Sequence, residues 1–136
     1  GWIPTKALGQ DFAFLHQPVA DNDLLLKSSK KLSKYMCSHS IQRWVWNVAT
    51  IKNLSNHPTI KRPKLTSFDD LYFRLETQIS TPVDEETSLF LVLVEVVPLN
   101  KIWNSRILES INSMSDNVLN YKNLIEIKKY LNGLKF

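Results

Sequence analysis

The most reactive side chains of this sequence are those of Cys37 and His39, which stand two positions apart. On an extended backbone two such residues share one face, as a thiolate nucleophile and its base would require. A working pair also needs an orienting group and an electropositive pocket, and the neighbouring sequence marks neither. A zinc site would need further ligands at regular spacing, but His16 and His57 lie far away along the chain. The pattern therefore indicates neither a catalytic pair nor a metal site.

Other catalytic chemistry finds no better support in the residues. The only glycines are Gly1, Gly9 and Gly133, too few and too scattered for a phosphate-binding loop. The acidic pairs Asp69–Asp70 and Glu85–Glu86 fall in predicted turns, where we interpret them as solubilising residues. We therefore predict no catalytic residue, no metal, no cofactor and no enzymatic activity.

Composition indicates a folded domain with an uneven charge. The 136 residues are 43% hydrophobic, enough to bury a core, and one cysteine excludes an internal disulfide. No segment has the length and apolarity of a membrane span, so no membrane partner is expected. The net charge is +4, but residues 1–66 hold ten Lys and Arg residues against three acids, whereas residues 67–136 hold seven against ten. The basic half is either a solvated surface or the contact for an anionic partner.

Hydrophobic periodicity and turn residues predict how the chain is divided. Residues 1–22 are expected to form an irregular N-terminal arm, and residues 23–136 a single α+β domain. The predicted fold is an antiparallel meander of three or four strands with an N-terminal helix and two C-terminal helices. The helices are expected at 23–36, after Asn100 and at about 120–132, and the strands at 41–51, 67–80 and 88–97.

The stretch Ser88–Leu99, SLFLVLVEVVPL, is apolar on both faces and carries one charge, Glu95. Such a strand is either covered on both sides, or covered on one side and used for docking on the other. We predict that Leu89–Val97 is an inner strand between the strands 41–51 and 71–79. Glu95 is then expected to be buried and to pair with Arg74.

Two groups of residues could bind a partner. Aromatic side chains on strands and on a helix could anchor a protein, although core packing explains the tryptophans equally well. Basic side chains on the first helix and in the loop at 52–66 could contact a phosphate backbone. The first group is Trp44, Trp46, Tyr72 and Trp103, and the second is Lys27, Lys30, Lys31, Lys34, Lys61, Arg62 and Lys64.

The order of elements resembles the RWD fold, and in particular the globular heads of kinetochore subunits. The likeness lies in Leu32–Cys37 before the first strand, Val94–Leu99 at the end of the meander, and the final helix around Leu119–Leu131. Ubiquitin-conjugating relatives keep a catalytic cysteine with no counterpart here, because Cys37 precedes the sheet. The resemblance implies a non-enzymatic scaffold head of a nuclear, chromosome-segregation complex that binds a peptide or helix of another subunit. The alternative is a nucleic-acid-binding module that uses the basic half.

Overall fold

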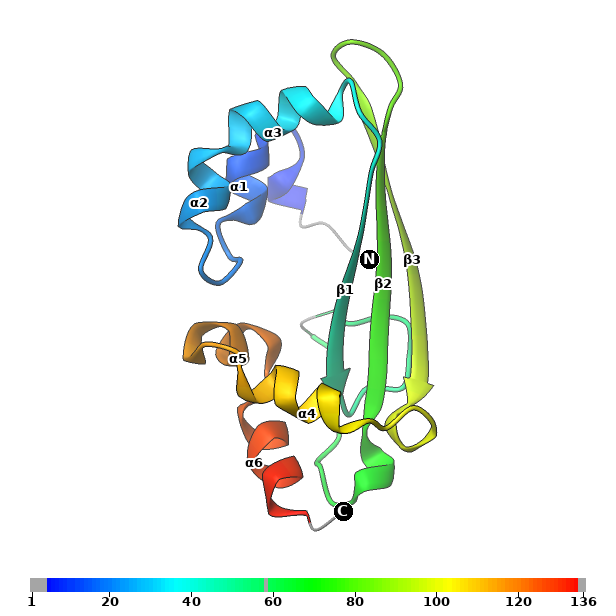
Figure 1. Ribbon diagram of the computed structural model, residues 1–136. Helices are drawn as coiled ribbons and strands as arrows, with labels where there is room; N and C mark the ends of the chain where they lie inside the picture. The colour runs from blue at the N-terminus through cyan, green and yellow to red at the C-terminus, as the bar shows by residue number, and fades with distance from the viewer. Residues whose placement is uncertain (1–4, 58, 135–136) are drawn as a thin grey trace. The chain divides into compact units, whose positions relative to one another are not determined.

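The protein is described by a computed structural model covering residues 5–57 and 59–134. It is an α+β structure whose three strands form one antiparallel sheet in the order β1-β2-β3 (Figure 1). The predicted α+β class and the meander are confirmed at this level. The part of the expected N-terminal arm at residues 1–4 lies outside the described residues.

Three short helices precede the sheet. The arm contains a 3-10 turn at Thr5–Ala7 and helix α1 (Phe12–His16), whose first turn is capped because the Asp11 carboxylate accepts a bond from the Phe14 amide at 2.8 Å. The helix predicted at 23–36 is divided into α2 (Asp23–Lys27) and α3 (Ser29–Met36). Ser28 separates them, consistent with the tendency of serine to favour helix ends over helix interiors.

The strands begin and end close to their predicted positions. They are β1 (Ile41–Ala49), β2 (Tyr72–Pro82) and β3 (Ser88–Pro98). β2 begins later than expected because Phe68–Asp70 forms a 3-10 turn, closed by a capping box between Ser67 and Asp70. The capping box thus holds the first residues of the predicted strand in a turn.

The prediction that Leu89–Val97 is an inner strand is wrong. β2 occupies the centre of the sheet and β3 an edge. The short loop at 83–87 places β3 beside β2, and β1 pairs with the other side of β2, so apolar composition did not decide the order. Glu95 is exposed rather than buried, and the buried Arg74 donates a hydrogen bond from Nη1 to the Leu54 carbonyl at 2.7 Å.

Three helices follow the sheet where two were expected. They are α4 (Ser105–Asn112), α5 (Asp116–Lys122) and α6 (Ile125–Gly133). Asp116 begins α5 because the Ser115 hydroxyl caps this helix by accepting from the Val118 amide. α5 ends at Asn123, which has a left-handed φ of 56°, and the Leu124 amide then bonds the Leu119 carbonyl at 2.8 Å.

The chain divides into two compact units, and the division crosses all three strands. We call the residues up to Val45 together with Glu76–Leu93 the hairpin unit. Trp46–Leu75 together with the residues from Val94 onward form the core unit.

The core unit contains the main hydrophobic cluster. Its eight buried side chains come from β1, the segments around β2 and β3, and the C-terminal helices, and they are Val48, Leu71, Leu99, Ile111, Leu119, Leu124, Ile127 and Leu131. The end of α5 is tied to β1 because Lys122 Nζ donates to the Trp46 carbonyl at 2.6 Å and Asn47 Nδ2 donates to the Lys122 carbonyl at 3.1 Å. The helices therefore hold the strands of this unit by packing and by direct bonds.

The hairpin unit is built differently. Helices α1, α2 and α3 contact one another, and Asn22 Nδ2 donates to the His16 and Gln17 carbonyls at 2.9 Å. Among its described residues only Ala7 and Ser80 are buried. This unit has no counterpart to the cluster of large side chains in the core unit.

Candidate functional site

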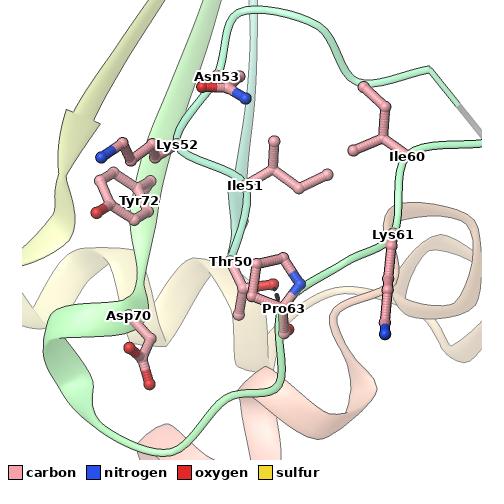
Figure 2. Close-up of a pocket in the computed structure, with 9 residues that line it drawn as sticks. All are labelled: Thr50, Ile51, Lys52, Asn53, Ile60, Lys61, Pro63, Asp70 and Tyr72. Carbon is pink, nitrogen blue, oxygen red and sulfur yellow. Dashed lines mark hydrogen bonds between the residues drawn. The ribbon is translucent and has the colours of Figure 1, made fainter.

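The core unit contains a pocket of about 340 Å³ beside the end of β1. Its walls come from the end of β1, the loop at 52–66 and the start of β2 (Figure 2). This volume is at the lower end of the range for ligand sites, roughly 300–1,000 Å³. The lining residues are Thr50, Ile51, Lys52, Asn53, Ile60, Lys61, Pro63, Asp70 and Tyr72.

The pocket joins an apolar centre to a charged rim. Ile51 and Ile60 point toward each other in Figure 2, and Thr50 Oγ1 donates to the Pro63 carbonyl at 2.8 Å, which ties the loop to the end of β1. Lys52 and Lys61 are exposed, and Tyr72 is half-buried. These groups could hold a small molecule with an apolar body and a polar end.

Asp70 lines the pocket, but its carboxylate already accepts hydrogen bonds that stabilise the local fold. Its Oδ2 accepts hydrogen bonds from the Thr66 hydroxyl at 2.7 Å and from the Thr66 and Ser67 amides, both at 2.8 Å. These bonds, the Thr66 hydroxyl first, hold the pKa of Asp70 below its ordinary value. The carboxylate therefore stays ionised at neutral pH as part of the capping box.

The structure separates the four predicted aromatic anchors. Trp46 packs against the core, stacks on Phe73 at 5.6 Å between ring centroids and lies under Lys122. Trp103 also packs against the core and meets Phe68 edge to face at 5.2 Å. Trp44 is 62% exposed in the hairpin unit, and Tyr72 lines the pocket. Core packing thus accounts for Trp46 and Trp103, whereas Trp44 and Tyr72 remain accessible.

All seven predicted basic contacts are exposed, but they belong to two groups. One lies along α2 and α3 in the hairpin unit, and the other lies in the loop of the core unit, where Lys61 lines the pocket. Arg62 also donates from Nη2 to Asn56 Oδ1 at 3.1 Å. The groups are Lys27, Lys30, Lys31 and Lys34, and Lys61, Arg62 and Lys64.

Cys37 and His39 follow α3 in a turn rather than on an extended strand. The His39 ring stacks on Tyr35 at 4.1 Å, and its Nδ1 lies 2.8 Å from the Ser38 hydroxyl. Within residues 5–57 and 59–134, no three His, Cys, Asp or Glu side chains come together as a metal site. Across the same residues, no helix has the length and apolarity needed to span a membrane.

The longest uninterrupted run of exposed large apolar side chains among the described residues lies at the start of β3. Leu89, Phe90, Leu91, Val92 and Leu93 are exposed in succession, at 48%, 50%, 49%, 39% and 62%. We call Leu89–Leu93 the apolar run. Its composition was visible in the sequence, but its exposure was missed because the strand was expected at the centre of the sheet. Single exposed apolar residues are ordinary on protein surfaces, whereas five in succession on a strand are not, which makes the apolar run a candidate interaction surface.

One family model matches nearly the whole chain. It is described as haem-dependent oxidative N-demethylase, alpha subunit-like, and the match spans residues 1–132. The chain belongs to this family. No curated protein matches the sequence.

Membership in the N-demethylase α-subunit-like family corrects the RWD resemblance. The chain is not a relative of kinetochore heads, and the expected roles at the kinetochore and in chromosome segregation are wrong with it. The resemblance depended on an order of helices and strands with few matched residues, and the meander-plus-helices arrangement suits many α+β domains. The nuclear location was implied by the same resemblance and stays an untested prediction.

The prediction of a non-enzymatic protein is also wrong, because the family is related to an oxidative demethylase subunit. The argument had relied on missing nucleophile–base pairs, metal spacing and phosphate loops. In haem enzymes the cofactor carries the reactive centre, and the protein supplies an axial ligand such as His, Cys, Met or Tyr and a shaped environment. One axial ligand and a shaped pocket do not produce a fixed spacing of residues, so a single sequence does not reveal them.

The lining of this pocket does not fit a haem site. The pocket is lined by one residue of an axial-ligand type, Tyr72, together with two lysines and an aspartate. His16 Nδ1 lies 2.8 Å from the Phe12 carbonyl and His57 Nδ1 lies 2.7 Å from Thr59 Oγ1, so each ring is oriented through one nitrogen, as the rings of metal-ligating histidines also are. Neither of them, nor His39 or Cys37, lines the pocket. The cofactor in the family's description is therefore not assigned to this pocket.

Proposed function

We propose that this chain contributes a protein-binding α+β segment to an enzyme of the haem-dependent oxidative N-demethylase kind. The family match over residues 1–132 supports the reaction class, and the word "subunit" in the family's description agrees with an assembled enzyme. The binding role depends on one observation, the exposed apolar run Leu89–Leu93 on an edge strand.

The apolar run suits protein recognition for two physical reasons. An edge strand offers unpaired backbone groups that can extend a sheet across an interface. The side chains of the run then add apolar area on both faces of that sheet. The lysines of the pocket rim would make a weaker and more salt-sensitive contribution, because they are exposed to solvent.

A tagged protein purified from its source cells tests this function. Oxidative removal of an N-methyl group releases formaldehyde, so the preparation is incubated with a panel of N-methylated amines and formaldehyde is measured. We expect haem absorbance and formaldehyde release from the wild-type preparation. A preparation with neither haem nor formaldehyde would contradict the assignment of the reaction class.

A pair of matched variants tests the binding role. Leu91→Lys places a charge in the middle of the apolar run, whereas Leu24→Lys places the same charge on α2, where Leu24 is 77% exposed. We expect Leu91→Lys to reduce the haem and activity recovered with the tagged chain, and Leu24→Lys to leave both unchanged. Equal recovery with the two folded variants would remove the apolar run from the binding surface.

Binding of nucleic acid through the basic half is the second candidate, because all seven predicted basic side chains are exposed. A phosphate contact weakens steeply as salt rises, with a slope set by the number of phosphates neutralised. A titration with duplex DNA and with single-stranded RNA at several salt concentrations measures that slope. Binding that is absent at low salt would exclude this candidate.

A further inference from the structure

We propose that the pocket beside the end of β1 binds a small amphipathic carboxylate, a molecule with one anionic end and an apolar body. This inference is independent of the protein-binding role, because the lining residues belong to the core unit and the apolar run to the hairpin unit. The volume of about 340 Å³ restricts the ligand to a small molecule, since ligand pockets extend to roughly 1,000 Å³.

The charge of the pocket rim selects an anion. The loop at 52–66 carries four Lys and Arg residues and no acidic residue. Two of the four, Lys52 and Lys61, line the pocket with exposed side chains. The one carboxylate in the described lining is that of Asp70, and one of its oxygens already accepts three hydrogen bonds. An anionic ligand therefore meets two opposite charges at this rim, whereas a cationic ligand meets two like charges.

The placement of the two lysines favours a carboxylate over a phosphate. Figure 2 shows Lys52 and Lys61 on different sides of Ile51, with ammonium groups that do not converge on one point. Phosphate sites gather several backbone N–H groups at a helix N-terminus or in a glycine-rich loop, and the described lining contains neither a glycine nor an α-helical residue. A carboxylate needs fewer donors, which the lining supplies in its lysines, the Asn53 amide and the Tyr72 hydroxyl.

The centre of the pocket suits the apolar body of the ligand. Ile51 and Ile60 point toward each other there, and the rings of Pro63 and Tyr72 add apolar surface to the lining. Each methylene group that a ligand buries at this centre should tighten binding about fourfold. Apolar contact thus supplies most of the affinity. The exposed lysines, whose charges are screened by salt, supply the preference for an anion.

Hydrogen bonds hold the walls of the pocket in place without a ligand. Thr50 Oγ1 ties the end of β1 to the Pro63 carbonyl at 2.8 Å, and Arg74 Nη1 ties β2 to the Leu54 carbonyl at 2.7 Å. The hydrogen bonds to Asp70 fix the end of the same loop. A site that is already ordered loses less conformational entropy on binding, so a small ligand can bind despite its small area.

The experiment titrates the isotope-labelled full chain with acetate, butanoate, hexanoate and octanoate, each below its micelle-forming concentration. Amide chemical shifts locate the bound carboxylate, and their concentration dependence gives the dissociation constant. We expect octanoate to shift the amides of residues 50–53, 60–62 and 70–72. The dissociation constant should fall by about tenfold or more for every two methylene groups added, until the pocket is filled. Octylammonium, with the same chain and the opposite charge, should bind roughly tenfold more weakly than octanoate.

Each part of the proposal has an outcome that would overturn it. Octanoate that leaves the pocket amides unshifted, or shifts only those of α2 and α3, would remove the ligand from the pocket. Acetate that binds as tightly as octanoate would reduce the effect to general attraction of anions. Octylammonium that binds as tightly as octanoate would remove the selection by charge. Octyl phosphate that binds more than about tenfold tighter than octanoate would overturn the choice of a carboxylate.

Two matched variants place the anion more closely. Lys61→Gln and Lys64→Gln remove the same charge from the same loop, but only Lys61 lines the pocket. We expect Lys61→Gln to raise the dissociation constant of octanoate about two- to fivefold and Lys64→Gln to leave it nearly unchanged. Equal effects of the two variants would place the carboxylate outside the pocket. The series of ligands on the wild-type chain needs no substitution, so it decides the proposal even if a variant does not fold.

Discussion

The two units of this protein differ in how many of their apolar side chains are buried. The core unit buries eight large apolar side chains in one cluster, and six side chains in it are essentially inaccessible. The hairpin unit buries only Ala7 and Ser80 among its described residues, yet it exposes the apolar run and also Trp44, Val83 and Leu24. The strands cross both units, so the difference lies in what packs against each part of them.

This contrast separates apolar surface that stabilises the chain from apolar surface that is left for binding. In the core unit the C-terminal helices cover the apolar side chains of the strands. This burial supplies the main favourable free energy of folding. In the hairpin unit similar residues remain in contact with water, an arrangement that a partner would relieve. Stability should therefore be concentrated in the core unit, and protein binding in the hairpin unit.

The largest expected difference comes from shortening leucines in the two units. Leu131→Ala removes a side chain with no accessible surface and should lower the free energy of unfolding by about 2–5 kcal/mol. Leu93→Ala, at 62% exposure, should change it by less than about 0.5 kcal/mol. Urea denaturation at low protein concentration measures both. Similar losses would mean that the hairpin unit has a core after all.

Hydrogen exchange should show the same division along the chain. Amides of β1 and β2 within the core unit need the cluster to open, whereas outward-facing amides of the apolar run lie at a free edge. We expect the latter to exchange faster by at least about tenfold, the factor given by a difference near 1.4 kcal/mol in opening free energy. Slow exchange across Leu89–Leu93 would contradict the edge position.

A smaller effect is expected at the turn between α5 and α6. Asn123 has a φ of 56°, a conformation that asparagine tolerates and β-branched residues resist. Asn123→Val should destabilise the core unit by about 1–2 kcal/mol, whereas Asn123→Gly should remain close to wild type. Thermal unfolding of the two variants makes the comparison. Equal melting temperatures for Val and Gly would show that this turn does not constrain the unit.

The smallest effect concerns the capping box beside the pocket. The pKa of Asp70 lies below its ordinary 3.8, so its ionised form stabilises the fold above about pH 4, and this contribution disappears as the pH falls through the lowered pKa. Asp70→Asn should therefore lower the denaturant concentration at the midpoint of unfolding near neutral pH. The difference between the midpoints of the variant and the wild type should become smaller in acid. Denaturation curves at both ends of this range provide the measurement. A gap that is independent of pH would assign the loss to geometry instead of charge.

Local patterns predicted most elements because each depends on neighbouring residues. Alternation in β2 and the apolar composition of β3 located both strands within a few residues of their observed bounds. The caps were harder to predict. The Ser67–Asp70 box and the Ser115 cap each changed where an element begins, because a side-chain bond to the backbone competes with the hydrophobic pattern.

The candidate sites depended on contacts that no local pattern contains. Trp44 and Trp46 share one face of β1, but only the packing of Phe73 and Lys122 distinguishes the half-buried ring from the exposed one. The pocket joins Thr50 to Tyr72 across a loop, a proximity that is absent from the sequence order.

The sequence by itself determined that this chain has a sheet with apolar strands and amphipathic helices, because periodicity and composition are properties of neighbouring residues. Only the tertiary structure decided that β2 is central, that β3 is an edge and that Leu89–Leu93 remain exposed. A strand that is apolar on both faces favours burial without specifying what will bury it. The order of strands sets that outcome, and here it leaves the most hydrophobic strand at the edge.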